Sequence, residues 1–278
     1  MIGIVDVGGG LRDIYGAGIF DRCIEEKMTF DYCLGVSAGS ANIASFLAGQ
    51  RGRNFRFYVE YSRRREYMSA RNFLRKRAYI DLDYVYSTLA NSDGEDPLDY
   101  PALRDNPAKM KIVVTDAVTG GPIYFDKSDL CQDNYDVLKL SSNLPGICPA
   151  YPFRGGMYYD GGLSDPVPVE RALADGCERV AVILTRPREF VRTIGKDRYF
   201  ALAVRRKYPK TAQSLLKRYE VYNRQVEFAK RLEREGRALI LAPDNLFGVD
   251  TLKRDPENLK ALYQKGYEDA EKLREFLR

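Results

Sequence analysis

The chain has 278 residues, of which 45% are hydrophobic, and its net charge of +5 is unevenly spread. Residues 1–185 hold 21 basic and 25 acidic side chains, whereas residues 186–278 hold 23 and 14. Histidine is absent, which excludes a Ser-His-Asp triad and any histidine metal site within the chain.

The cysteines and the apolar segments limit where the protein acts. The five cysteines are widely spaced and form no C-x-x-C pair, so they predict reduced thiols, not a disulfide framework or a zinc site. No apolar run approaches the roughly 18 residues that cross a bilayer, and Met1 leads into Ile2–Val7 without a basic leader. We expect a cytoplasmic protein, with any membrane contact peripheral and at the inner membrane surface.

The first part of the chain alternates strands and helices. Residues 2–7 are short, β-branched and apolar, and they predict a buried strand that ends in three glycines. A helix follows, then a second strand at residues 30–34, a turn at Gly35 and a helix at residues 40–48. Further strands are predicted at residues 111–115, 135–140 and 180–184. The order predicts an α/β fold, a three-layer sandwich with a mainly parallel central sheet.

Two segments do not belong to this alternation. Residues 51–105 form a polar and aromatic insertion, which we expect to pack over one end of the sheet as a partly helical cap. Beyond Pro187 the chain predicts long charged helices at residues 209–236 and 255–278, joined by a strand at residues 238–242. We therefore divide the chain into a catalytic domain, residues 1–187, and a basic, mostly helical C-terminal extension, residues 188–278.

A nucleophile-elbow pattern, Gly35-Val36-Ser37-Ala38-Gly39, lies between a predicted strand and a predicted helix. Small residues let the strand and the helix approach closely around a strained turn, which exposes the Ser37 hydroxyl at a helix N-terminus. In isolation this pattern fits an ordinary glycine-flanked turn equally well. Two further motifs favour the elbow.

The first of these motifs is the glycine loop after the first strand. Gly8, Gly9 and Gly10 are followed by Leu11 and Arg12, and glycines let backbone N–H groups approach an acyl oxygen as an oxyanion hole. The competing interpretation is a dinucleotide-binding fingerprint. That fingerprint needs glycine where Asp13 stands, and an acidic side chain would repel a phosphate.

The second motif is Asp160-Gly161-Gly162, which follows a β-like segment. Alone, an aspartate before two glycines is most often a turn. A serine nucleophile needs a base, however, and without histidine a carboxylate must take the proton from a partly desolvated position. Asp160 fits this role best.

Together, the triple glycine with its arginine, the G-V-S-A-G-S elbow and the late D-G-G resemble the patatin-like phospholipases over residues 2–185. The resemblance implies a Ser37–Asp160 dyad, an oxyanion loop at Gly8, Gly9 and Gly10 supported by Arg12, and no metal or other cofactor. It is closest to a bacterial subgroup with a helical C-terminal extension. Three residues depart from the family pattern: Asp13 in the glycine loop, and Asn143 and Gly146 in a proline-containing segment ahead of the D-G-G.

The insertion interleaves ten basic with six aromatic residues between Arg51 and Arg77. The favoured interpretation is that the aromatic rings cover the sheet while the arginines face water. The alternative is a basic, aromatic lid that docks on anionic membrane. We expect no nucleic-acid partner, because no nucleic-acid motif accompanies the charge.

The expected function is that of a serine acyl hydrolase, which cleaves fatty-acyl esters of phospholipids or related lipids through an acyl-enzyme. The alternative is a catalytically impaired lipid-binding or protein-interaction module, in which Asp13 has disabled the glycine loop. Nucleotide binding is a distant third hypothesis.

Overall fold

The fold is built on one central sheet, and the computed structural model describes residues 1–253 and 255–278. Neighbouring strands follow the order β5-β6-β3-β2-β1-β7-β8, and β4 pairs with β3 beside this path. The strands are β1 (Ile2–Asp6), β2 (Tyr32–Val36), β3 (Lys109–Asp116), β4 (Pro122–Asp126), β5 (Tyr151–Phe153), β6 (Gly156–Asp160), β7 (Arg179–Ile183) and β8 (Ala238–Leu241).

Four of the strand pairs are parallel, namely β1–β2, β1–β7, β2–β3 and β7–β8. The pairs β3–β4, β3–β6 and β5–β6 are antiparallel. The mainly parallel α/β sheet predicted from the sequence is therefore confirmed. Because β1, β2 and β7 are parallel neighbours, the loops that follow them meet at one edge of the sheet.

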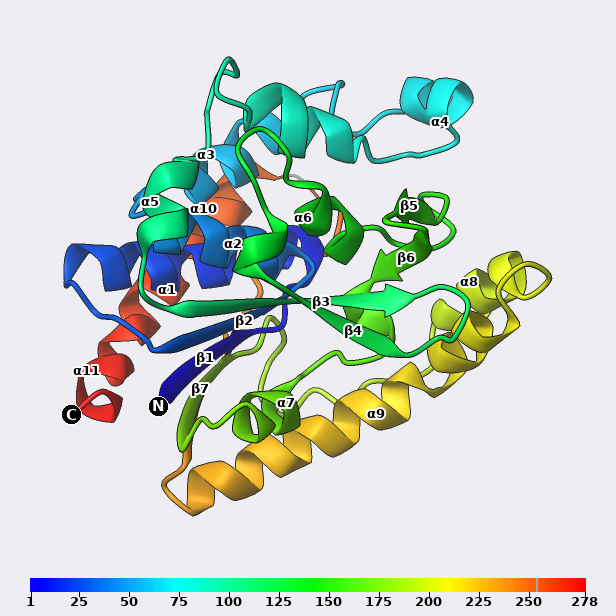
Figure 1. Ribbon diagram of the computed structural model, residues 1–278. Coiled ribbons are helices and arrows are strands. Elements are labelled where there is room, and N and C mark those ends of the chain that lie inside the picture. Colours follow the sequence, from blue (N-terminus) through cyan, green and yellow to red (C-terminus); the bar gives the residue numbers. More distant parts are fainter. Residues whose placement is uncertain (254) are drawn as a thin grey trace.

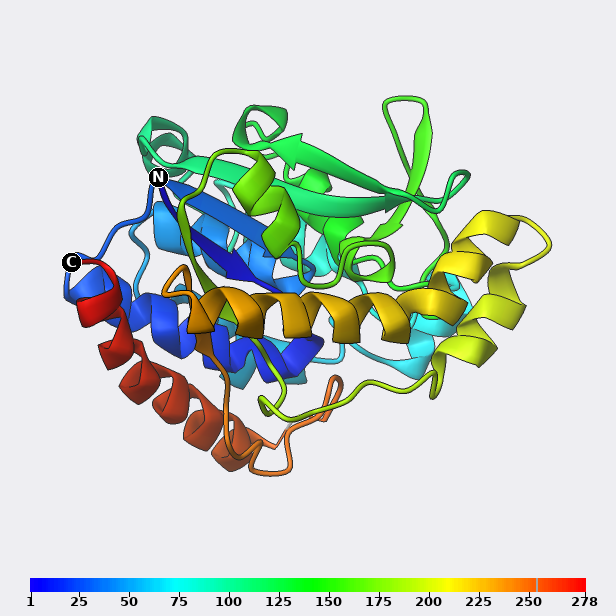
Figure 2. The same ribbon diagram turned by 90° about the horizontal axis from the view of Figure 1, so that it is seen from below.

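Helices cover both faces of the sheet (Figures 1 and 2). Alternate strand residues supply the two cores: Ile4 packs into the core with α1 and α2, while Val5 packs into the core with α7 and α9. The helices outside the cap are α1 (Ile14–Glu25), α2 (Ala38–Leu47), α6 (Asp136–Ser141), α7 (Val169–Ala174), α8 (Asp197–Val204), α9 (Pro209–Arg234), α10 (Pro256–Asp269) and α11 (Leu273–Phe276).

The predicted insertion forms a partly helical cap. It holds α3 (Arg53–Val59), α4 (Ala70–Lys76), a π-helical segment (Tyr84–Leu89) and α5 (Tyr100–Asp105). Tyr58 and Tyr61 are buried, as the favoured interpretation expected, but Phe73 and Leu74 on α4 are exposed. Figure 1 shows α4 at the outer tip of the cap, away from the sheet.

One predicted element is wrong. Residues 135–140 were expected to be a strand, but they form the N-cap and nearly all of α6, and Val137, Leu138 and Leu140 are all buried. A short, fully buried apolar run does not show whether it is helix or strand, because the alternation that marks a half-buried element is missing. The sequence analysis also overlooked β4, whose residues are exposed or half-buried, and the short helix α8.

The chain beyond residue 187 contributes to the sheet and to its covering layers. Strand β8 lies where a strand was predicted, at residues 238–242, and it pairs with β7. Helix α9 runs along the face opposite the cap (Figure 2). Helix α10 packs closely on α1, where the Tyr15 hydroxyl donates a hydrogen bond to Asp269 Oδ2 at 2.9 Å. In the described part of the chain, no helix combines the length and the apolar character that crossing a membrane requires.

Candidate active site

Ser37 lies at the turn between β2 and α2 and has φ 56° and ψ −129°. A positive φ is rare for a residue with a side chain, and such strain is typical of functional turns. The flanking glycines make the turn sterically feasible. A Cβ on Gly35 would lie 2.5 Å from Ser40 Cα, and one on Gly39 would lie 2.5 Å from the carbonyl oxygen of Asp6.

Ser141, on α6, fixes the backbone of the elbow from below. The Ser37 amide donates to Ser141 Oγ at 2.8 Å, and the Ser141 hydroxyl donates to the carbonyl of Val113 on β3 at 2.7 Å. The nucleophile turn is thereby tied to the neighbouring strand. The sequence analysis missed Ser141, since a serine at the end of an apolar run carries no distinguishing signal.

The glycine loop lies directly beside the elbow. Gly8, Gly9 and Gly10 have φ of 65°, 143° and 62°, and a Cβ on Gly8 would lie 3.1 Å from Ser37 Cβ. The Gly8 amide donates to Asp6 Oδ1 at 3.1 Å, which fixes the loop. The amides of Gly9 and Gly10 donate no hydrogen bond to the part of the chain that the structure describes. These two N–H groups are free donors in the loop beside the elbow.

Arg12 joins the glycine loop to two other segments. Its Nε donates to the carbonyl of Thr185 at 3.2 Å, and its Nη1 donates to Asp250 Oδ1 at 3.2 Å and to Thr251 Oγ1 at 2.5 Å. The Thr185 hydroxyl in turn donates to the carbonyl of Gly8. Burial of the guanidinium lowers the pKa of Arg12 to about 10, so it stays charged at neutral pH.

Asp160 ends β6 and is 1% exposed. Its Oδ1 accepts a hydrogen bond from the Gly162 amide at 2.8 Å, while Oδ2 is buried and accepts none from the described residues. Burial raises the pKa of Asp160; the charge of Arg218 is the largest opposing influence, followed by the side chain of Ser37. The Ser37 hydroxyl therefore lies near the carboxylate without forming a hydrogen bond of ordinary geometry.

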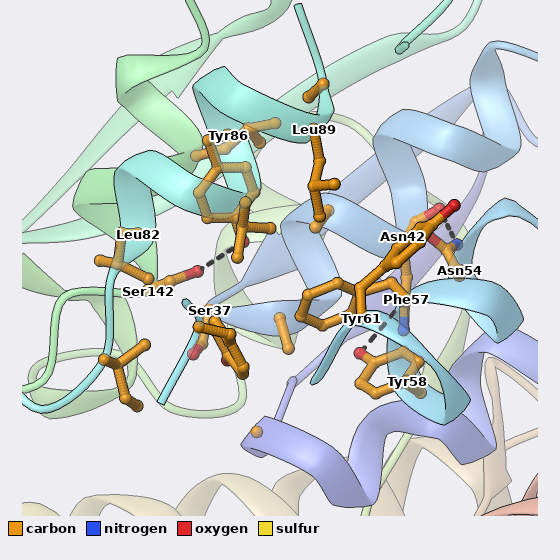
Figure 3. A pocket seen from close by; sticks show the side chains of 18 of the residues that line it. Ser37, Asn42, Asn54, Phe57, Tyr58, Tyr61, Leu82, Tyr86, Leu89 and Ser142 are labelled. Atoms are coloured by element: carbon orange, nitrogen blue, oxygen red, sulfur yellow. Dashed lines mark hydrogen bonds between the residues drawn. The ribbon is translucent and has the colours of Figure 1, made fainter. Parts of the chain in front are cut away.

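An apolar cavity opens above Ser37 and is covered by the cap (Figure 3). Its empty space, part of which is open to solvent, is about 1030 Å³. The cap contributes Phe57, Tyr58, Tyr61, Tyr67, Ile80, Leu82, Val85, Tyr86, Leu89, Ala90 and Leu98 to its wall. The Tyr86 hydroxyl is 3.0 Å from Ser142 Oγ, so it joins the cap to the segment after α6.

The three departures from the family pattern lie outside this cavity. Asp13 is fully buried under the glycine loop and faces Asp6 and Asn42, not Ser37. Asn143 is also buried, and its side-chain amide donates to the carbonyls of Pro149 and Tyr158. Gly146 has φ 79° and adjoins Phe200. None of the three lines the cavity wall.

Among residues 1–253 and 255–278, no three His, Cys, Asp or Glu side chains come together in a group that could hold a metal ion. Four cysteines are buried, Cys131 is exposed, and all five are free thiols.

The fold and the site together define an α/β protein with a serine at a nucleophile elbow. The sequence matches the family described as patatin-like phospholipase over residues 7–173. The chain belongs to this family. Residues 208–277 match a second family, which is described only as a domain of unknown function, DUF6363.

Individual proteins also resemble the chain. It is 30% identical over 199 residues to the uncharacterized protein YjjU of Escherichia coli (strain K12), an alignment that covers 69% of this chain and 54% of YjjU. The chain thus spans about half the length of this curated relative. The crystal structure of VipD from Legionella pneumophila matches with a TM-score of 0.50 at 15% identity, over 98% of this chain and 66% of VipD. At this identity the likeness concerns the fold alone.

Proposed function

We propose that the protein is a serine acyl hydrolase that cleaves fatty-acyl esters of phospholipids or related lipids with a Ser37–Asp160 dyad. The observation that carries the proposal is the buried Oδ2 of Asp160, to which no described residue donates a hydrogen bond although the Ser37 side chain lies near this carboxylate. A carboxylate in water is too weak a base for a serine hydroxyl. Burial raises the pKa of Asp160 and so strengthens it as a base.

In this mechanism, Ser37 Oγ attacks the acyl carbonyl carbon while its proton passes to Asp160 Oδ2. The amides of Gly9 and Gly10 donate to the oxyanion, and the N-terminus of α2 adds favourable partial charge. The tetrahedral intermediate expels the alcohol, which takes the proton from Asp160. Water, deprotonated by Asp160, then attacks the acyl-enzyme and releases the fatty acid with Ser37 restored.

The character of the cavity supports the proposal that it binds the acyl chain of the substrate. Its wall from the cap is mostly aliphatic and aromatic, with Arg53, Asn54 and Asp96 as the charged or amide members, and Ser37 lies in the same cavity (Figure 3). Burying an alkyl chain there is favourable at about 25 cal/mol per Å² of apolar area removed from water. Polar groups near the nucleophile are few, so the wall favours a fatty-acyl chain over a polar acyl group.

The tip of the cap supports contact with an anionic membrane, which we propose as the source of the substrate. Phe73 is 53% exposed and Leu74 is 83% exposed. Around them lie Arg71, Arg75, Arg77 and Tyr79, all exposed, and no carboxylate pairs with these arginines within the described part of the chain. These six residues are called the α4 surface below. Exposed apolar side chains can insert into a lipid surface, and neighbouring arginines without a carboxylate partner can bind anionic headgroups.

The dyad is tested with a soluble p-nitrophenyl ester and a fluorophosphonate probe. Ser37→Ala should abolish hydrolysis and labelling, and Asp160→Asn should lower kcat/KM by about 10²- to 10⁴-fold, the usual range for loss of a general base. Ser92→Ala, in an exposed loop, is the matched control and should behave as wild type. Full activity in either dyad variant would refute the mechanism. A folded wild-type protein that is neither labelled nor active would instead favour a lipid-binding module.

A further inference from the structure

Helix α9 belongs to the region that matches the domain of unknown function, and its Arg218 lies close to Asp160 of the proposed dyad. We propose that Arg218 is a positioning residue, whose charge beside Gly162 keeps the Asp160 carboxylate ionised next to Ser37. This inference rests on the function proposed above. It gives the C-terminal extension a direct part in the chemistry.

The position of Arg218 is defined at Gly162. A Cβ on Gly162 would lie 3.1 Å from Arg218 Nη2 and 3.1 Å from Asp160 Oδ1, so the guanidinium and the carboxylate flank the same residue. The Gly162 amide already holds Oδ1. Among the described residues the guanidinium forms no ion pair with Asp160 within 4.0 Å, so it acts on the carboxylate through its charge, while the Gly162 amide occupies Oδ1 and leaves Oδ2 free.

The arginine is not neutralised by a partner of its own. Arg218 Nη1 lies 3.6 Å from Asp197 Oδ1, but the other oxygen of Asp197 already pairs with Arg192 Nη2 at 2.9 Å. The Nε atoms of both arginines are buried and donate no hydrogen bond to the described residues. One carboxylate therefore serves two guanidiniums, and the remaining positive charge acts on Asp160.

The groups that face Asp160 come from four elements. They are Ser37 at the start of α2, Tyr86 in the cap, Arg192 before α8 and Arg218 on α9. Burial raises the pKa of Asp160, and Arg218 opposes this more than any other group does. Because the base must be ionised, kcat/KM should rise as the pH rises through this pKa. Removing Arg218 should raise the pKa and so move this rise, the acid limb of the pH profile, to higher pH.

The test compares pH profiles of kcat/KM on a soluble ester between about pH 4 and pH 9. Arg218→Gln should shift the acid limb upward by about one unit, the lower end of the effect of a nearby opposite charge, with roughly tenfold less activity below it. Arg218→Lys should restore most of the wild-type profile. Arg224→Gln, an exposed arginine of the same helix, is the matched control and should leave the profile unchanged.

Asp197→Asn supplies a variant with the opposite expected sign. It removes the carboxylate that Arg192 and Arg218 share, so more positive charge acts on Asp160 and the acid limb should move to lower pH. General damage to the fold does not produce opposite shifts in two variants. An unmoved limb in both variants, with an active wild type, would overturn the inference about Arg218 alone. A wild type that neither hydrolyses esters nor reacts with the fluorophosphonate would overturn the proposed function itself.

Discussion

The carboxyl groups of Asp6 and Asp13 form a buried pair beneath the glycine loop. Both residues are fully buried, and a Cβ on Gly16 would lie 2.8 Å from Asp6 Oδ2 and 2.7 Å from Asp13 Oδ1. Asn42 Nδ2 donates to Asp6 Oδ2 at 3.4 Å, but neither carboxyl oxygen of Asp13 accepts a hydrogen bond from the described residues. Two adjacent buried carboxylates repel each other, so the pair retains a proton.

Retaining this proton makes the stability of the fold depend on pH. Burial raises the pKa of Asp6 from 3.8 to about 6, and burial together with the charge of Asp6 raises the pKa of Asp13 well above its usual range. Below about pH 6 the folded pair holds both protons, which the unfolded chain releases above about pH 4, so the free energy of unfolding falls as the pH rises. Each retained proton costs about 1.4 kcal/mol per pH unit, and for Asp6 alone the loss reaches about 3 kcal/mol by pH 6.

Asp13→Asn should make this decline shallower. The amide needs no shared proton and can donate a hydrogen bond to the carboxylate of Asp6. Between about pH 4.5 and pH 6, the free energy of unfolding of the variant should fall by about 1.4 kcal/mol per pH unit less than that of wild type. Asp13 has φ −78° and ψ 5°, an ordinary conformation that asparagine adopts without strain.

Urea unfolding at several pH values, followed by circular dichroism, measures these slopes. Asp93→Asn, in an exposed loop, is the control and should keep the wild-type slope. Equal slopes for Asp13→Asn and wild type would refute the shared proton. A variant that is less stable at every pH would show instead that the Asp13 carboxylate is charged and stabilises the loop.

Two further predictions concern the elbow and the cap. Ser141→Ala removes the acceptor of the Ser37 amide and the donor to Val113, so urea unfolding should show a loss of about 1–3 kcal/mol, and kcat should fall. Unchanged stability and kcat would mean that the elbow holds its strained turn without Ser141. Phe73→Ser with Leu74→Ser should weaken co-sedimentation with phosphatidylglycerol vesicles yet leave hydrolysis of a soluble ester unchanged. Leu216→Ser, at an exposed leucine of α9, should leave both vesicle binding and ester hydrolysis unchanged. Wild-type vesicle binding by the double variant would exclude the α4 surface as the membrane contact.

Local sequence patterns predicted the parts of the fold that local physics determines. β1, β2, β3 and β7 are apolar runs bounded by glycine, polar residues or turns, and the structure contains a strand at each. α6 was mistaken for a strand because its apolar residues are buried all round, so tertiary packing and not periodicity selects its conformation. β4 was overlooked because an exposed antiparallel strand needs few apolar residues.

The site could be predicted only as far as it lies in contiguous motifs. The structure brings Ser37, the glycine loop and Asp160 together because they follow β2, β1 and β6 at one side of the sheet. Ser141, Thr185 and Arg218 were missed because each is an ordinary residue in its own segment. Their contacts with the site join positions about 100 or more residues apart, or in the case of Arg218 arise where α9 packs on the turn after β6.

Three buried aspartates near Ser37 differ in the charge that they carry, and their neighbours determine the difference. All three are desolvated, which raises the pKa of each. Asp6 and Asp13 face each other, so the pair keeps a proton and fixes the glycine loop from below. Asp160 faces Arg218, which opposes protonation and leaves it able to accept the proton of the serine. In the proposed mechanism the base is therefore distinguished by a cation from the C-terminal extension, and removing that cation should leave the serine in place but lose the charge that suits Asp160 to act on it.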